Sequence, residues 1–167
     1  MSLSLTFDEL LRYTNGEREK WRGWFVGHAD ALEASVQSGG RFPTVGKLID
    51  HIFLVERRHL QRLLDEPLTN STGLTGNNAS PLFDYGASVR RELEQYVQDL
   101  TDLEDDVADE QRPFVVGDRE WSLTPRKLLF HILLHELRHW AQIALALRVA
   151  GIEPPGEHDL FYSTALR

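Results

Sequence analysis

The sequence contains no cysteine among its 167 residues. Disulfides and thiolate ligands are therefore excluded, and any metal that the chain binds must be held by nitrogen or oxygen atoms. The same absence excludes a cysteine nucleophile. If the chemistry needs a thiol, that thiol must arrive with the substrate.

Long apolar runs and excess positive charge are also missing. No stretch approaches the roughly 18 apolar residues of a membrane span, and the first residues lack the basic start and apolar run of a signal peptide. We therefore expect a cytoplasmic protein with no membrane partner. The chain has 18 Lys and Arg against 26 Asp and Glu, a formal net charge of −8. Such a surface repels phosphate backbones, so no nucleic-acid partner is expected.

Helical periodicity is the main positive signal in the sequence. With 41% hydrophobic residues, the chain can build one core, and we expect a single domain over residues 1–167. Apolar residues recur at spacings of three and four in four segments, which predicts an all-α four-helix bundle. The expected helices cover residues 6 to about 38–40, 44–64, about 84–106 and 125–150. Residues 114–116 and 119–121 flank a Gly-Asp turn and predict a small hairpin before the last helix.

Local signals mark the ends of these segments. Thr6, Thr44 and Thr124 precede the periodic segments as N-cap residues, and Thr124 is followed by proline at the first helical position. Gly151 supplies a stop after the last helix. Residues 67–81 are rich in Thr, Asn, Gly and Ser, which predicts a surface loop.

Three of the seven histidines, His131, His135 and His139, are spaced four apart on the most apolar segment. Residues four apart lie about 40° apart around a helix and about 6 Å along it, so both imidazoles can reach one metal. Residues eight apart cannot, and the spacing leaves two pairs open, His131 with His135 or His135 with His139. A third ligand must come from another helix, and His51 is the best candidate because it lies inside an apolar stripe.

The remaining histidines carry weaker signals. His59 lies beside two arginines, and we expect it on a solvated surface. His28 falls on the tryptophan-rich stripe of the first helix, where we expect core packing or contact with the outside of the site. His158 lies in a polar tail without ligand spacing.

The last helix also matches a protease motif. Residues 135–139 read HELRH, which fits the H-E-x-x-H pattern of zinc metalloproteases with Glu136 as general base. The residues that follow lack the glycine and third histidine of metzincins, and only one short hairpin could align a peptide substrate. A zinc metalloprotease is therefore the weakest of the functional hypotheses.

A longer pattern resembles the DinB/YfiT-like family, which is unrelated to the DNA polymerase of that name. Its elements are HELRHWAQI at residues 135–143, LRVAGIEPP at 147–155, and then Asp159 and Tyr162. Upstream, His51 followed five residues later by Glu56 is similar to the family's first-ligand helix. Residues 140–141 are Trp-Ala where the family often has Arg-Gly, a departure that affects the pocket and leaves the ligands intact.

The resemblance implies a four-helix bundle, commonly a homodimer, that holds one divalent transition metal through His51, His135 and His139. It thereby chooses between the two histidine pairs and leaves His131 as a neighbour. Imidazole ligands suit zinc or nickel first, with iron, copper or manganese as alternatives. Characterised relatives include thiol-dependent transferases and isomerases, which implies a small-molecule substrate such as a low-molecular-weight thiol.

Three neutral imidazoles would leave the metal an open coordination position, as in catalytic centres. A metal of this kind lowers the pKa of a bound thiol, which favours a metal-dependent thiol S-transferase. The alternative is a non-catalytic protein that binds a metal or a stress ligand. Glu56, Glu136 and Gln142 are candidates for orienting histidine rings or moving a proton, and the sequence assigns none of them as a catalytic base.

Overall fold

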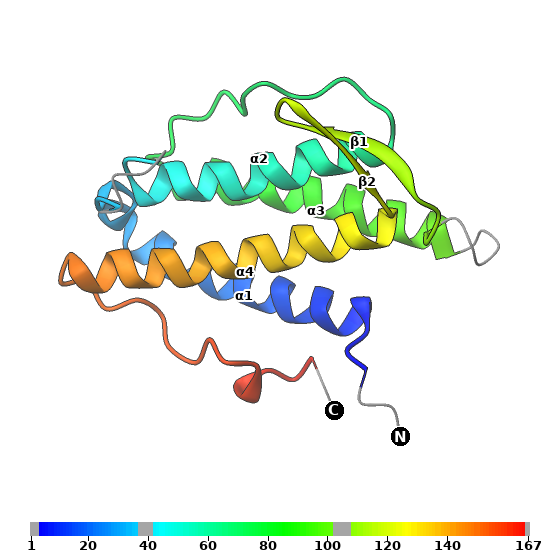
Figure 1. The fold of residues 1–167 in the computed structure, drawn as a ribbon. Coiled ribbons are helices and arrows are strands. Elements are labelled where there is room, and N and C mark those ends of the chain that lie inside the picture. The colour runs from blue at the N-terminus through cyan, green and yellow to red at the C-terminus, as the bar shows by residue number, and fades with distance from the viewer. Residues whose placement is uncertain (1–3, 37–41, 102–107, 166–167) are drawn as a thin grey trace.

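The computed structural model describes residues 4–36, 42–101 and 108–165. Four helices, α1 (Phe7–Gly27), α2 (Val45–Leu63), α3 (Ala79–Thr101) and α4 (Pro125–Val149), lie side by side as a bundle (Figure 1). Two short 3-10 helices, η1 (Ala29–Glu33) and η2 (Leu160–Tyr162), follow α1 and α4 along the chain. The predicted all-α four-helix bundle is confirmed. No helix in the described ranges is long and apolar enough to cross a membrane.

The structure contains the side-chain caps that the sequence predicts at the N-terminal ends of three helices. The Thr6 hydroxyl accepts the Glu9 N–H, and the Glu9 carboxylate accepts the Thr6 N–H, which forms a capping box at α1. The Thr44 and Thr124 hydroxyls accept the N–H groups of Lys47 and Lys127 and so cap α2 and α4. Gly151 has a φ of +75°, the left-handed conformation that ends a helix without strain.

Two predicted helix boundaries were wrong. Helix α1 ends at Gly27, because His28 leaves the helical conformation, and the chain continues as η1. The apolar residues whose spacing predicted a longer helix belong instead to η1, where Ala31 and Leu32 are buried. Helix α3 begins at Ala79, five residues before the predicted start, because its first turns bury three further apolar side chains. The predicted ends near 38–40 and at 106 lie outside the described residues.

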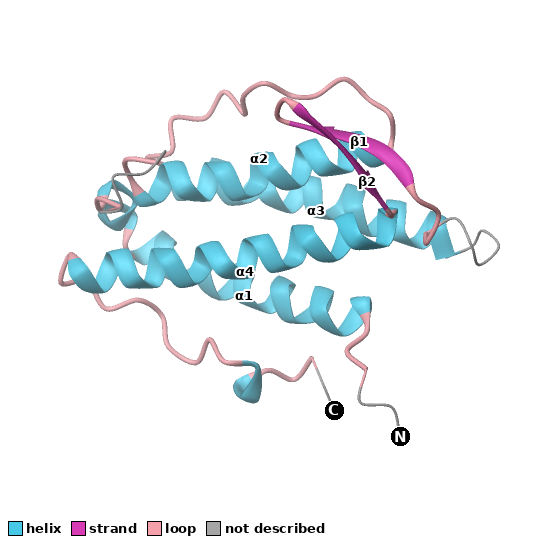
Figure 2. Ribbon diagram, in the orientation of Figure 1, coloured by secondary structure: helices cyan, strands magenta, loops and turns pink. Residues whose placement is uncertain are grey.

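The predicted hairpin is present and slightly longer than expected (Figure 2). Strands β1 (Arg112–Val116) and β2 (Arg119–Leu123) pair antiparallel, with Phe114 opposite Trp121. Phe114 is 4% exposed and packs into the bundle core, whereas Trp121 is 47% exposed. One buried aromatic side chain therefore fixes the hairpin to the bundle.

The apolar core is divided into two clusters along the bundle. Trp21, Phe53 and Trp140 belong to one cluster, and Leu60 and Leu133 belong to the other. In each helix a buried charged residue falls between the residues of the two clusters in sequence. We call these four residues the charge cluster: Arg18 of α1, Glu56 of α2, Arg90 of α3 and Glu136 of α4.

The chain between α2 and α3 crosses close to the start of α2. A Cβ atom added to Gly46 would lie 1.6 Å from the carbonyl oxygen of Gly76, a distance that no side chain can occupy. Gly76 itself has a φ of +84°. The loop over residues 66–78 is thus held against α2 by a backbone contact that requires glycine at position 46.

Candidate metal centre

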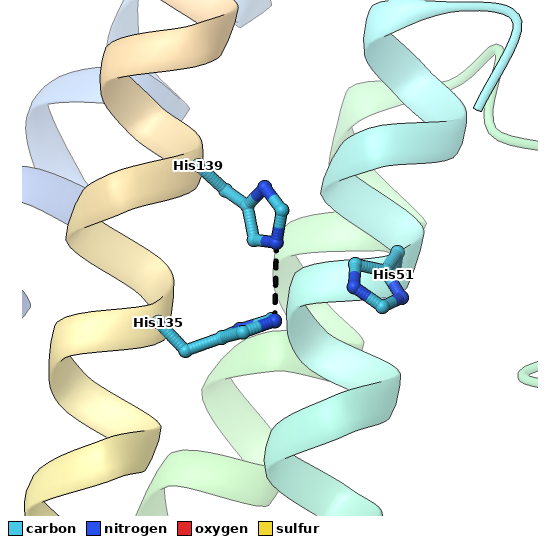
Figure 3. Close-up of side chains that lie close together, drawn as sticks. All are labelled: His51, His135 and His139. Carbon is cyan, nitrogen blue, oxygen red and sulfur yellow. Dashed lines mark hydrogen bonds between the residues drawn. The ribbon is translucent and has the colours of Figure 1, made fainter. Parts of the chain in front are cut away.

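His51 of α2 meets His135 and His139 of α4 across the seam between these helices. The potential ligand atoms of the three residues all lie within 4.8 Å of one another. Figure 3 shows the three rings converging on one small space between α2 and α4. The two helices run antiparallel, so the middle of α2 lies opposite the middle of α4 and residues 84 or more positions apart become neighbours.

The geometry of the three rings suits one metal ion. The Nε2 atoms of His135 and His139 face each other at 3.0 Å, and the ring centre of His51 lies 5.2 Å from each of their ring centres. Two nitrogens bound tetrahedrally at about 2.0–2.1 Å from zinc lie about 3.3 Å apart, close to the observed separation. The residues therefore fit a mononuclear site with imidazole ligands.

Gln142 fixes the orientation of one of these rings. The Oε1 atom of Gln142 lies 2.5 Å from Nδ1 of His139 and accepts its N–H. This bond leaves the Nε2 lone pair of His139 directed at His135, which is the tautomer that a metal needs. Outer hydrogen bonds of this kind orient histidine ligands in metal sites, so Gln142 has the orienting position that the sequence suggested.

Burial favours the neutral form of the His135 and His139 imidazoles. Burial, together with the neighbouring His139 and His51 rings, lowers the pKa of His135 to about 3. Burial also lowers the pKa of His139, although the bond to Gln142 opposes this, and the charge of Arg138 adds to the lowering. Neutral imidazole is the form that binds metals, so protons compete little at neutral pH.

His131 lies one turn before His135 on α4 and faces a different partner. Its ring centre is 5.7 Å from that of His135 and 5.3 Å from that of His59. The prediction that His59 lies on a solvated surface was wrong, because α2 turns this side chain toward α4 and leaves it 5% exposed. Burial lowers the pKa of His59 to about 3.

Two histidines lie outside the seam, and for His28 the prediction of core packing or contact with the site was wrong. His28 is exposed, stacks on Trp24 with ring centres 4.2 Å apart, and packs neither in the core nor against the site. His158 stacks on Trp21 at 4.9 Å, and its Nδ1 atom lies 2.6 Å from a carboxylate oxygen of Glu17. The second contact joins residues 141 positions apart, and no local sequence signal could have shown it.

The carboxylates of Glu56 and Glu136 lie in the charge cluster and not among the histidine rings. Arg18 donates to Glu136 through Nε at 2.6 Å and through Nη2 at 2.8 Å, and Nη2 also donates to Glu56. Arg90 donates to Glu56 through Nε at 2.7 Å and to Glu136 through Nη2 at 2.6 Å. Trp140 Nε1 donates to Glu136 at 3.0 Å. Each glutamate therefore binds both guanidinium groups.

This environment commits both glutamates to buried ion pairs. Burial by itself would raise the pKa of Glu56, but the Arg18 and Arg90 guanidiniums outweigh burial and hold the pKa below its usual value. The Glu136 side chain is 1% exposed and accepts four hydrogen bonds from three residues. A metalloprotease needs this glutamate free beside the metal, so the HELRH sequence does not form the protease arrangement here.

Comparison with known families agrees with this geometry. A sequence model of the DinB family matches residues 1–165, and the chain therefore belongs to the DinB family. No curated protein matches the chain. Family membership and the three-histidine cluster are both consistent with metal binding.

Proposed function

We propose that this protein is a metal-dependent transferase that uses a low-molecular-weight thiol as its nucleophile. The main support for this proposal is the group of three imidazoles from α2 and α4, whose potential ligand atoms lie within 4.8 Å of one another. We assign His51, His135 and His139 as ligands of one divalent metal, with zinc or nickel first and iron, copper or manganese as alternatives. When bound, such a metal lowers the pKa of a thiol and so supplies thiolate at neutral pH.

The surrounding residues support a reaction that needs no protein nucleophile. The chain has no cysteine, and the two buried glutamates near the seam are held by arginines. Gln142 orients His139, and the buried seam keeps His135 neutral. The role of the chain is thus to bind, orient and partly desolvate the reactants, while the thiol arrives from solution.

Metal content tests the ligand assignment. We expect about one divalent metal per chain by elemental analysis, because three imidazoles form one tetrahedral site with an open position. His135→Ala and His139→Ala should abolish binding, whereas His131→Ala, the matched control on the same helix, should retain the metal. Loss of metal in His131→Ala together with retention in His139→Ala would identify the other histidine pair as the ligands.

A cobalt-substituted protein tests the chemistry. Addition of the correct thiol should produce a sulfur-to-metal charge-transfer band, and the His51→Ala protein should not show it. Turnover is then measured with the same thiol and an electrophile such as monochlorobimane. Fully metallated protein that gives neither a band nor a product across a broad thiol panel would favour the non-catalytic binding protein.

A further inference from the structure

The surface beside His51 is hollowed. A depression of about 350 Å³ is lined by His51 together with Phe42, Leu54, Lys47, Asp50 and Arg58, among others. The Phe42 ring lies 4.2 Å from the His51 ring, so an apolar wall adjoins the proposed ligand. The volume is at the lower end of the range for small-molecule sites. A compact organic group has room next to the metal centre.

Lys47 and Arg58 line this depression, and two further cations, Arg62 and Arg138, lie on the two helices that form the seam. Lys47, Arg58 and Arg62 lie four residues before, seven after and eleven after His51, which places all three on the same face of α2. Arg138 directly precedes His139 on α4 and is exposed. In the described part of the chain, no carboxylate lies within ion-pair distance of any of these four cations.

The hydrogen bonds of these cations leave their charge uncompensated. Lys47 donates to the carbonyl of Leu74, Arg58 to those of Thr69 and Asn70, and Arg62 to that of Val115. Carbonyl oxygens satisfy the N–H groups but carry no net charge. Asp50 is the one carboxylate among the lining residues described, and its Oδ1 atom accepts the Thr72 hydroxyl. The depression therefore has an excess of positive charge in a chain of net charge −8.

The same excess reaches the histidines of the seam. Burial and the positive charge of Arg62 lower the pKa of His59 to about 3, and no carboxylate contributes to this shift. A divalent cation held by three neutral imidazoles would add further positive charge, because none of its ligands is an anion.

We propose that the substrate of this site is an anionic thiol, in which a carboxylate or similar group binds the cations around the depression while the sulfur faces the three histidines. This inference rests on the proposed function and names its substrate class. Lys47 and Arg58 line the depression together with the apolar side chains of Phe42 and Leu54. Arg138 lies on α4, next to His139. The four cations act as specificity determinants, since a neutral or cationic thiol gains nothing from them.

Three thiols of similar length and different charge test the proposal. Cobalt-loaded protein is titrated with 3-mercaptopropionate, 2-mercaptoethanol and cysteamine, and the charge-transfer band gives each dissociation constant. We expect 3-mercaptopropionate to bind about tenfold more tightly than 2-mercaptoethanol, and cysteamine to bind most weakly. The difference should shrink as sodium chloride is raised, because exposed charges are screened.

A pair of arginine variants locates the effect. Arg138→Gln should reduce the preference for 3-mercaptopropionate over 2-mercaptoethanol several-fold. Arg148→Gln is the matched control, because it removes the same charge from an exposed position on α4 that lines a different pocket. Equal affinities for the three thiols, or equal effects of the two variants, would overturn the proposal.

A further measurement separates failure of the proposed thiol chemistry from failure of the charge preference. If no thiol gives a band, the proposed function fails, and the charge preference is then measured with succinate and acetate through the visible spectrum of the cobalt protein. Tighter binding of succinate, reduced in Arg138→Gln and kept in Arg148→Gln, would support an anionic ligand of another kind. Equal binding of the two carboxylates would reject it.

Discussion

Glu136 follows a proposed metal ligand in the sequence, yet its carboxylate serves the fold. It bridges Arg18 and Arg90 inside the bundle and accepts the Trp140 N–H as well. A change to glutamine leaves the two buried guanidiniums with one carboxylate between them. Breaking a buried ion pair from one side is costly, because the remaining charge cannot regain water.

We therefore predict that Glu136→Gln lowers the free energy of unfolding by about 3–5 kcal/mol while the folded protein still binds metal. Urea denaturation and elemental analysis measure the two quantities. Glu19→Gln, an exposed change on α1, should stay within about 0.5 kcal/mol of the parent protein. Loss of metal at unchanged stability would instead place Glu136 in the metal centre.

His59 gives the fold a dependence on pH. Its pKa is about 3 in the folded chain and 6.5 as the ordinary value, so only the unfolded chain takes up the proton between these limits. Its contribution to stability is complete above pH 6.5 and is lost as the pH falls below that value. The slope approaches about 1.4 kcal/mol per pH unit.

Metal-free His59→Gln protein should therefore lose less stability than the parent between pH 6.5 and pH 5, by about 2 kcal/mol. Urea denaturation at several pH values provides the comparison. His28→Gln replaces an exposed histidine and should follow the parent protein. A parallel response of the His59 and His28 variants would show that His59 is not buried in its neutral form.

At the scale of helices and strands, local sequence signals predicted most of what was found. The caps at Thr6, Thr44 and Thr124 and the stop at Gly151 depend on neighbouring residues only, so they could be read directly. The periodicity around Leu32 could not separate a continuing helix from a 3-10 turn, because both bury the same face.

The sequence predicted the candidate site only in part. Spacing on α4 offered two histidine pairs, and only the packing of α2, or resemblance to a family, could choose between them. The pairing of Arg18 and Arg90 with the two glutamates was missed, because it joins four helices and leaves no periodic pattern. The burial of His59 was missed because its arginine neighbours suggested a polar face.

The contact between α2 and the 66–78 loop gives a prediction at this scale. Gly46→Ala places a methyl group where the Gly76 carbonyl lies, so the loop must move. We expect a loss of about 1–3 kcal/mol in the free energy of unfolding, measured by urea denaturation. Gly23→Ala on α1 meets no atom within 4 Å and should be neutral or stabilising by up to about 1 kcal/mol. Equal effects of the two changes would contradict the close contact.

At the scale of the whole molecule, we expect a homodimer. Helix α4 exposes Leu134, Leu145 and Val149, which are 54%, 63% and 55% exposed. A row of apolar side chains on one helix suits a symmetric contact with a second copy. Light scattering at micromolar concentration should give twice the chain mass, and Leu145→Glu should give a monomer. Leu68→Glu, in the 66–78 loop, is the control, and a monomeric parent protein would remove the expectation.

The charge cluster also has a consequence for how this chain can diverge. Each of the four helices contributes one member, and every single replacement strands a buried charge. An exchange of all four for apolar residues of similar volume carries no such penalty, whereas each intermediate along the way does. Arg18, Glu56, Arg90 and Glu136 should therefore be inherited as a block, and descendants that lose one of them should survive only by losing its partners as well.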